Sequence, residues 1–404
     1  MNAVVLGNGR SGKAAAALLR REGWSVDVLD GEDAWPSGLH SLCVTSPGIP
    51  LDHPWQKAAR AAGVPVVSEL QLGVERYRAL GGRMLAVTGS KGKSSVVKLV
   101  ADAVGGIPCG NYGKPISEVA LDFPRPPSTI CPPWAVVEVS SFQMETTDLP
   151  PDAFEAAAIL NLQEDHLDRH GSARAYHALK RKLLGFARVK ISGDGQAKSP
   201  GDVRLLADSY FDNPVLRGNG MCSVALMRAA GLSDGDIREA FVRFEPLPHR
   251  MQTVGTFGGV TWIDDSKATS IAALMAGVEM AAHRFGGSVP KVRLIAGGLP
   301  KGDDPMAARS CLSAGVSKVY LIGQCADRME AAWKDAVPCE RCGTLECAVE
   351  SAALEAACGD CVLLSPGTAS FDQFKSYAER GERFAELAIR RWESKKIVQK
   401  NACK

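Results

Sequence analysis

Short apolar runs alternate with amphipathic stretches along most of the chain. At the start, the run AVVL (residues 3–6) is followed by a glycine-rich turn, an alanine- and leucine-rich stretch and the run SVDVL (residues 25–29). This succession of strand, turn, helix and strand is typical of the first unit of a parallel α/β domain. A strand (LCVT) and a strand–helix pair (VPVVSELQLGVERYRAL) follow, and the double glycine at positions 81 and 82 is a suitable boundary. We therefore predict a Rossmann-like domain over residues 1–82.

Two more blocks repeat this alternation. RMLAVTGSKGKSSVVKLVADAV opens the second block as strand, glycine loop and helix, and the apolar runs in WAVVEVSSFQME and AAAILNLQEDHLDRH each end in acidic residues. Residues 189–220 carry little apolar pattern, and a capped helix then leads to a proline-marked linker near Leu247. VTWIDD, VRLIAGG, VSKVYLIG and CVLLS are the predicted strands of the third block. The pattern predicts an α/β protein of three domains: residues 1–82, a central P-loop ATPase-like domain at 83–247 and a Rossmann-like domain at 248–404.

Composition and charge narrow the classes of function. Apolar residues make up 46% and charged residues 23% of the chain, which is the balance of a soluble protein. Because 47 basic residues stand against 45 acidic ones and no basic run occurs, we expect no nucleic acid partner. The N-terminus lacks a signal-peptide pattern, and no run approaches the roughly 18 apolar residues of a membrane span. We expect a cytoplasmic protein that does not bind membranes.

Four of the twelve cysteines have a spacing that occurs in zinc sites. Cys339, Cys342, Cys358 and Cys361 form C-x2-C-x15-C-x2-C. The segment between the two pairs has the composition and periodicity of a helix, which at about 1.5 Å per residue would keep the pairs roughly 20 Å apart. One tetrahedral zinc ion needs all four sulfurs about 2.3 Å from the metal. We therefore expect small apolar fillers in a reducing compartment, with Cys361 opening a buried strand, and no zinc site.

The first glycine loop, GNGRSG, matches G-x-G-x-x-G between a strand and a helix. Its glycines would let the backbone approach a diphosphate, and the helix N-terminus favours the negative charge. Asp30 ends the next strand, where an acidic residue contacts a ribose in dinucleotide-binding domains. Taken alone, the loop fits an NAD-dependent dehydrogenase. It predicts a nucleotide-type ligand and leaves the identity of the nucleotide open.

The second glycine loop, VTGSKGKSS at residues 87–95, indicates a triphosphate. Gly92, Lys93 and Ser94 match the end of the pattern G-x-x-x-x-G-K-[ST], but Gly89 stands two positions too close for its first glycine. An apolar strand precedes the loop and a helical pattern follows it. Lys93 could therefore reach the outer phosphates, and Ser94 could bind magnesium. A dehydrogenase has no use for this second loop, which weakens the hydride-transfer hypothesis.

The shortened loop is followed by six motifs in a characteristic order: VVEVSSFQ, NLQEDHLDRH, YHALK, LPHR, DDSKATS and LSPGTASFDQF. With these motifs the chain resembles the Mur ligase and folylpolyglutamate synthetase superfamily over nearly its whole length, and most of all its D-glutamate-adding (MurD) branch. The resemblance implies three domains, for a UDP-substrate, ATP and an incoming amino acid. It also implies a monomeric, cytoplasmic ligase of peptidoglycan synthesis, and hence of cell wall biogenesis, cell shape and cell division. Such a ligase joins D-glutamate to UDP-N-acetylmuramoyl-L-alanine through an acyl phosphate.

The resemblance assigns residues to the catalytic, ATP and magnesium sites. Lys93, Glu138, His166 and Lys180 would be catalytic. The ATP-binding set is Gly89, Ser90, Lys91, Gly92, Lys93, Ser94, Ser95, Arg250, Asp265 and Lys267, with His249 as a further candidate. Two magnesium ions are implied, with Ser94, Glu138, His166 and Lys180 as ligands. Lys180 matches the family lysine that carbon dioxide carbamylates, which turns a cation into a carboxylate-like ligand.

The resemblance also assigns the substrate residues. For the UDP-sugar they are Arg10, Ser11, Asp30, Thr45, Ser46, Gly48, Asn111 and His166; for D-glutamate they are Thr269, Lys301, Ser370 and Tyr377. His166 or Asp165 could take the proton of the incoming amine, and neither is preferred. His170 has no role in the family pattern, and we expect it at the surface.

One element departs from the family pattern. LRGNGMCSVAL stands where the family has G-x-H-N-x-x-N, so Gly220, Met221 and Val224 replace the residues that normally contact adenine. Adenine specificity therefore stays open. Two alternatives remain as well. One is a sibling ligase of the L-alanine-adding (MurC) type, which would differ at SFDQF and around Lys301. The other is a non-catalytic homologue that binds UDP-muramyl nucleotides without turnover.

Overall fold

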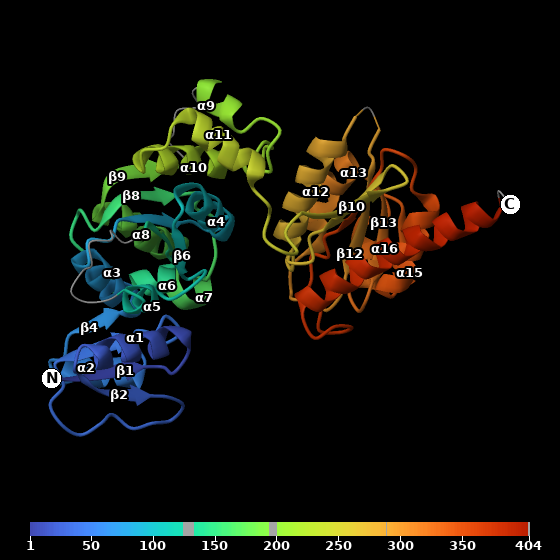
Figure 1. The fold of residues 1–404 in the computed structure, drawn as a ribbon. Coiled ribbons are helices and arrows are strands. Elements are labelled where there is room, and N and C mark those ends of the chain that lie inside the picture. The colour runs from blue at the N-terminus through green and yellow to red at the C-terminus, as the bar shows by residue number, and fades with distance from the viewer. Residues whose placement is uncertain (124–132, 194–199, 288, 403–404) are drawn as a thin grey trace. The chain divides into compact units, whose positions relative to one another are not determined.

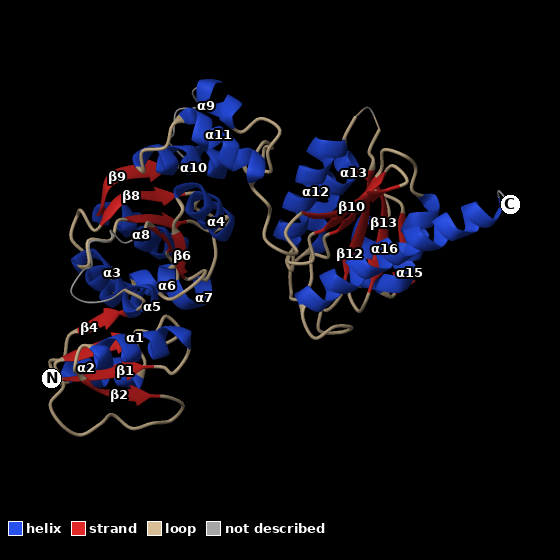
Figure 2. Ribbon diagram, in the orientation of Figure 1, coloured by secondary structure: helices blue, strands red, loops and turns tan. Residues whose placement is uncertain are grey.

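The apolar runs form three β-sheets in a computed structural model of the chain, which describes residues 1–123, 133–193, 200–287 and 289–402 (Figures 1 and 2). The chain divides into two units: Met1–Asp212 with Leu216–Phe244, and Asn213–Val215 with Glu245–Lys404. The first unit holds two sheets and the second unit holds one. The predicted α/β class with parallel sheets is confirmed. The domain boundaries at residues 82 and 247 stay predictions.

The first sheet has its strands in the order β2-β1-β3-β4, all parallel. Its elements are β1 (Asn2–Leu6), α1 (Arg10–Arg21), β2 (Ser25–Leu29), β3 (Leu42–Thr45), α2 (Pro54–Ala61), β4 (Val66–Ser68) and α3 (Glu69–Ala79). Glycine is required where α1 leaves the first loop, because a Cβ on Gly12 would lie 1.8 Å from the carbonyl oxygen of Gly7. This close approach aims the N-terminus of α1 at the carboxyl edge of the sheet, where ligands bind in parallel α/β domains.

The second sheet is fully parallel and has the order β6-β7-β5-β8-β9. Its first elements are β5 (Met84–Thr88), α4 (Lys93–Val104), β6 (Ile107–Gly110), α5 (Ile116–Leu121), β7 (Ala135–Glu138), α6 (Ser141–Met144) and β8 (Phe154–Ile159). They are followed by α7 (Leu167–His170), α8 (Ala173–Lys182), the 3-10 helix η1 (Leu183–Phe186), β9 (Ala187–Ser192), α9 (Pro200–Leu205), α10 (Arg217–Ala229) and α11 (Asp234–Arg243). The central strand β5 is buried at every position, as its unbroken apolar sequence predicts.

The third sheet has the order β10-β11-β15-β12-β13-β14, and only the edge strand β10 is antiparallel to its neighbour. Its first elements are β10 (Gln252–Phe257), β11 (Val260–Asp264), α12 (Ile271–Phe285), β12 (Val292–Gly297), the 3-10 helix η2 (Pro305–Ala308), α13 (Arg309–Gly315) and β13 (Val316–Ile322). The last are α14 (Ala326–Trp333), β14 (Cys339–Gly343), α15 (Leu345–Glu355), β15 (Cys361–Leu364) and α16 (Tyr377–Ala402). Figure 2 shows α12 and α13 on one face of this sheet, with α15 and α16 on the other.

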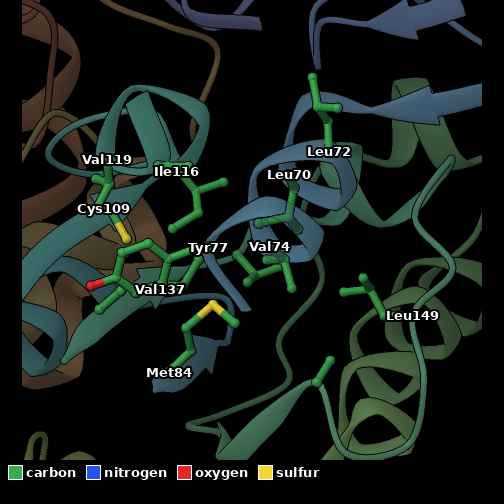
Figure 3. Packing of buried hydrophobic residues seen from close by; sticks show 14 of the residues in the cluster. Leu70, Leu72, Val74, Tyr77, Met84, Cys109, Ile116, Val119, Val137 and Leu149 are labelled. Carbon is green, nitrogen blue, oxygen red and sulfur yellow. The ribbon is translucent and has the colours of Figure 1, made fainter. Parts of the chain in front are cut away.

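One hydrophobic cluster runs through both sheets of the first unit (Figure 3). Leu70, Val74 and Tyr77 of α3 contribute to it together with Met84 of β5 and Ile116 of α5. The helices α3 and α5 pack closely because Gly73 has no side chain: a Cβ there would lie 2.5 Å from Cγ2 of Ile116. This packing attaches the first sheet to the second and sets the position of the loop that carries Asn111.

Three of the four cysteines with zinc spacing lie on strands of the third sheet, and Cys358 lies in the turn before β15. Cys339 and Cys342 are on β14 and Cys361 opens the buried strand β15, with β12 and β13 between these two strands in the sheet order. The predicted helix between the pairs is α15. In the part of the chain that the structure describes, no three His, Cys, Asp or Glu residues are grouped so that they could hold a metal.

The sequence pattern did not indicate the helices and strand residues between positions 189 and 220. Residues 189–220 lack an apolar pattern, but they contain β9 residues, α9 and the start of α10. Two glycines, Gly218 and Gly220, lie inside the first turns of α10 and obscure its helical pattern. Within the described ranges, none of the helices combines the length and apolar character that a bilayer span needs.

Candidate active site

The second glycine loop connects the buried strand β5 to α4, as the sequence predicts. Its backbone turns at Gly92, which has φ of +84° and immediately precedes the first helical residue, Lys93. The N-terminus of a helix of this length carries unpaired N–H groups and a partial positive charge, which together suit a phosphate. Ser94 is half-buried, whereas Ser95 is buried in the protein. Of the two hydroxyls, that of Ser94 is therefore the more accessible to a ligand.

Two asparagines that the sequence analysis missed support this loop. Asn161 follows β8, and its side chain accepts from the Lys91 N–H (2.9 Å) and donates to the Lys91 carbonyl (2.8 Å). The same amide donates to Oδ1 of Asn219 at 3.1 Å. Asn219 is buried against the loop, so closely that a Cβ on Gly92 would lie 2.1 Å from its Nδ2. The position of Asn161 at the carboxyl end of a buried strand was the available sequence signal.

The predicted catalytic lysines lie together at the loop. The ammonium group of Lys93 donates to the carbonyl oxygens of Gly89 (2.8 Å) and Ser90 (3.1 Å), and that of Lys180 donates to Gly89 at 2.8 Å. Lys180 is fully buried, with its ammonium 4.6 Å from the centroid of the Tyr176 ring. Burial, and then the charge of Lys93, lower the pKa of Lys180 to about 7. At pH 7 a large fraction of Lys180 is therefore in the neutral amine form, and this amine lies beside the second glycine loop.

Glu138 ends β7 at the same edge of the sheet. Its Oε1 accepts from the Nδ2 of Asn111 at 2.7 Å. The carboxylate is buried, and among the described residues no hydrogen-bond donor reaches its Oε2. A buried carboxylate oxygen without a donor is costly unless a cation pairs with it. Glu138 therefore fits a magnesium ligand, and Asn111 lies directly beside it.

His166 and His170 occupy the ends of α7. His166 has a left-handed backbone (φ 52°), and its side chain is 45% exposed, with its ring 4.8 Å from that of Phe142. The expectation that His170 lies at the surface is wrong, because its side chain is only 3% exposed. Its ring contacts Ser141, Phe142, Glu145 and Tyr176, which the sequence could not show because these residues lie on α6, directly after α6 and on α8.

Six of the eight residues predicted for the UDP-sugar lie at the carboxyl edge of the first sheet. Arg10 and Ser11 open α1 after β1, Asp30 is exposed after β2, and Thr45 ends β3, followed by Ser46 and Gly48. Arg10 donates to the Gly113 carbonyl at 2.6 Å and so connects this edge to the loop of Asn111. Thr45 is buried and accepts a weak hydrogen bond from Gln56. Asn111 and His166, the other two residues predicted for the UDP-sugar, belong to loops of the second sheet, and the role of the whole set stays a prediction.

In the second unit, the predicted ATP residues surround the end of β11. His249 Nδ1 contacts the Asp264 carboxylate at 2.7 Å. Asp265 points inward, accepting from Ser365 Oγ (2.9 Å) and the Met251 N–H (3.2 Å), and burial raises its pKa to about 7. Arg250 is half-buried close by. In this structure both carboxylate oxygens of Asp265 therefore accept hydrogen bonds from the protein itself.

The residues predicted for D-glutamate adjoin these groups. Lys301 donates to the Thr269 hydroxyl at 3.3 Å, and the bridge between Leu299 and Ala369 brings the loop of Lys301 to Ser370. The ring of Tyr377 lies under the Lys267 ammonium at 3.6 Å. Sequence reasoning missed Arg380, which is buried and donates to Ser266 Oγ and to the carbonyl oxygens of Ser266, Thr368 and Ala369. It joins the loop of Lys267 to the loop of Ser370.

At α10, where the sequence departs from the family pattern, close packing leaves no room for the family's side chain at Gly220. Gly220, Met221 and Val224 are all buried in this helix. A Cβ on Gly220 would lie 2.4 Å from Cδ2 of Leu206, so a histidine does not fit there without rearrangement. The structure therefore offers no polar side chain at these three positions.

Comparison with known proteins shows which family the chain is similar to. Models of the Mur ligase middle domain and of the Mur ligase glutamate ligase domain match residues 87–193 and 249–367. Proteins named UDP-N-acetylmuramoylalanine--D-glutamate ligase from Acidobacterium capsulatum and Aquifex aeolicus are 32% and 34% identical over 96% of this chain, and over 95% and 98% of their own lengths. One from Frankia casuarinae is 37% identical over 92% of this chain and 85% of its own length.

Solved structures share the fold at lower identity. UDP-N-acetylmuramate-alanine ligase MurC from Thermotoga maritima has a TM-score of 0.56 and 16% identity, covering 98% of this chain and all of that one. MurF ligase from Thermotoga maritima, in complex with ADP, has a TM-score of 0.54 and 15% identity, covering 88% and 90%. By its family models and its relatives of more than 30% identity, the chain belongs to the Mur ligase family.

Proposed function

We propose that the chain is an ATP-dependent ligase that adds D-glutamate to UDP-N-acetylmuramoyl-L-alanine. The observation that carries this proposal is the identity of 32–37% to D-glutamate ligases over at least 92% of the chain. The arrangement of Lys93, Lys180 and Glu138 around one phosphate loop supports it. The enzyme would act as a cytoplasmic monomer in peptidoglycan synthesis, and so serve cell shape and division.

The reaction has two steps. The carboxylate of the muramyl substrate attacks the γ-phosphorus of ATP, which gives an acyl phosphate and releases ADP. The amine of D-glutamate then attacks the acyl carbon, phosphate leaves, and the amine proton is lost. The first step depends on position and charge neutralisation, and the loop N–H groups at the start of α4 and Lys93 supply both.

Magnesium would be held by Ser94 and Glu138, with His166 and a carbamylated Lys180 for a second ion. The free, buried Oε2 of Glu138 supports this assignment. Bound magnesium would neutralise phosphate charge during the transfer. Asn111 holds the other oxygen of Glu138 and thereby orients the carboxylate.

Lys180 has the properties that carbamylation requires. Carbon dioxide adds to the neutral amine, a nitrogen–carbon bond forms, and one proton is released. The lowered pKa of Lys180 supplies the neutral amine at physiological pH. The resulting carbamate is negative, so it would remove the repulsion between Lys180 and Lys93.

The amino-acid substrate would be recognised in the second unit. Lys301 and Thr269, which already contact each other, offer a cation and a hydroxyl to a dicarboxylate. Ser370 and Tyr377 add a hydroxyl and a ring beside Lys267. This set favours D-glutamate over an uncharged amino acid such as L-alanine.

One observation favours a second candidate, a homologue that binds UDP-muramyl nucleotides without turnover: Gly220, Met221 and Val224 offer no polar group for adenine. Phosphate release separates the two functions. With ATP, magnesium and UDP-N-acetylmuramoyl-L-alanine, we expect release that depends on D-glutamate and that L-alanine does not replace. Release indifferent to D-glutamate contradicts the ligase assignment, and no release with any amino acid supports the non-catalytic homologue.

A further inference from the structure

The short helix α7 is held in place by polar contacts. Its aliphatic residue, Leu167, is exposed, and the side chain that is largely shielded from water is the polar ring of His170. The backbone is left-handed at both ends, at His166 (φ 52°) and at Gly171 (φ 72°). A left-handed backbone is unfavourable for a histidine, so the surrounding structure must hold it there. The anchors are the last two residues of the helix, Arg169 and His170.

Arg169 forms a two-point ion pair with Glu145, the residue that follows α6. Its Nε lies 3.1 Å from Oε1 and its terminal nitrogen 2.6 Å from Oε2. The side chains are 17% and 6% exposed, so the pair is largely shielded from water. Such a fork fixes both distance and orientation, which a lysine could not do. The helix α6 is itself well fixed, because Ser140 and Gln143 form a capping box and most of its residues are buried.

The same guanidinium reaches the first sheet. It donates to the carbonyl oxygens of Ile49 (3.2 Å) and Pro47 (3.4 Å), in the loop after β3. This loop carries Ser46 and Gly48, two of the residues assigned to the UDP-sugar. Through its planar guanidinium, Arg169 therefore contacts both the loop after β3 in the first sheet and Glu145, which follows α6 in the second.

His170 completes the attachment on the other side of Glu145. Its Nδ1 lies 3.3 Å from Glu145 Oε1, and its Nε2 lies 3.0 Å from Ser141 Oγ. The rings of His170 and His166 both pack against Phe142. We call Glu145, Arg169 and His170 the α6–α7 clamp. Because the clamp holds α7 against α6, it also holds His166, the residue before α7, beside Phe142 of α6.

We propose that Arg169 is a positioning residue that couples occupancy of the UDP-sugar loop to metal binding at His166. A ligand that orders the loop at residues 46–49 fixes the two carbonyl oxygens that accept hydrogen bonds from Arg169. Arg169 in turn fixes the position of α7. Binding of the nucleotide sugar thus favours the arrangement in which His166 and Glu138 hold metal. The inference rests on the proposed function for the identity of the nucleotide sugar. By linkage, metal must favour the nucleotide sugar by the same factor.

The test measures this coupling without turnover. Free Mn²⁺ is followed by electron paramagnetic resonance during titration of the full chain with saturating ADP, with and without UDP-N-acetylglucosamine. This probe lacks the muramyl carboxylate, so it cannot be phosphorylated as the substrate is and has no carboxylate for the metal. In the wild-type protein we expect the probe to tighten Mn²⁺ binding at least about five-fold. In Arg169→Lys and Arg169→Gln we expect a change of less than about two-fold, and Arg174→Gln, an exposed arginine on α8, should behave as wild type.

The outcomes separate cleanly. Equal coupling in Arg169→Lys and in the wild type overturns the proposal, as does a wild-type protein without coupling. Arg169→Lys keeps the charge and removes the fork, so it serves if Arg169→Gln does not fold. Neither D-glutamate nor ATP hydrolysis enters the titration. Coupling in a protein that releases no phosphate would therefore refute the ligase assignment and leave the role of Arg169 supported.

Discussion

Lys93 and Lys180 donate to the same carbonyl oxygen, that of Gly89, each from 2.8 Å. Burial disfavours the charge on Lys180, and two ammonium groups that share one acceptor also repel each other. Its pKa is accordingly lowered to about 7. Of these two lysines, Lys180 is therefore the one whose amine is the more easily deprotonated.

Removal of the Lys180 amine should abolish most of the ligase activity. If Lys180 carries a carbamate, Lys180→Ala loses a negative metal ligand, and we expect kcat to fall by at least about 100-fold. Short carboxylic acids such as acetate should restore part of the activity, since they place a carboxylate in the vacated space. The measurement is phosphate release with and without added acid.

The matched control for Lys180 is Arg181→Ala, which removes an exposed cation at the next position of α8. It should keep near wild-type activity. Full activity in Lys180→Ala, or a loss that no carboxylic acid relieves, would contradict the carbamate role. Carbon-13 NMR of the wild-type protein in labelled bicarbonate should show a carbamate resonance that is absent from Lys180→Ala.

Gly92 should be essential for nucleotide affinity. Its φ of +84° disfavours any side chain, and a Cβ would lie 2.1 Å from Nδ2 of Asn219. Gly92→Ala should therefore displace the loop and weaken ADP binding at least about ten-fold, which corresponds to about 1.4 kcal/mol. Isothermal titration calorimetry measures this directly.

Gly105 provides the control at the other end of α4. It is also left-handed, with φ of +60°, but nothing lies within 4 Å of its would-be Cβ. Gly105→Ala should lower thermal stability without changing the affinity for ADP. Equal losses of affinity in the two variants would show that backbone strain in α4, and not the fit against Asn219, controls the loop.

The central strands β5 and β15 were predictable because they are buried on both faces. MLAVT in β5 and CVLL in β15 are unbroken apolar runs, and their burial at every position explains why local sequence sufficed. The helix α10 was not predictable in the same way. Its glycines lower helix propensity, and tertiary packing of Gly220 against Leu206 compensates.

Only those parts of the candidate site whose residues are neighbours in the sequence were predictable. The loop at Lys93 is recognisable from six neighbouring residues. The burial of Lys180, however, depends on Gly89 and Tyr176, and only the former is distant in sequence, 91 positions away. His170 was misplaced for a related reason, because Ser141 and Glu145, which cover it, precede it on another helix. Contacts between distant segments decide burial, and no local pattern encodes them.

Arg380 should matter for D-glutamate through the loops that it joins. Its guanidinium donates to four oxygens of two loops, and a lysine has too few donors in the wrong geometry to replace it. In Arg380→Lys we expect the KM for D-glutamate to rise at least about ten-fold, since hydrogen bonds from a charged group contribute about 1.5–3 kcal/mol each. Arg383→Lys, one turn along α16, should have little effect. An unchanged KM in Arg380→Lys would exclude this positioning role.

The buried Glu69 should make the stability of the protein depend on pH. Burial raises its pKa to about 7, against the usual 4.5, and the hydrogen bonding from Ser117, including its N–H at 2.8 Å, offsets only part of this rise. Between these two values the folded state keeps a proton that the unfolded chain has lost. The free energy of unfolding should therefore fall as the pH rises from about 4.5 to about 7 and then level off.

Glu69→Gln keeps an oxygen for Ser117 and has no charge, so it should be increasingly more stable than wild type across this interval, by at most about 3 kcal/mol at 1.36 kcal/mol per pH unit. Urea unfolding between pH 5 and 8 measures the difference, with Glu75→Gln, exposed on the same helix, as the control. A difference between Glu69→Gln and wild type that does not change with pH would show that Glu69 is charged throughout.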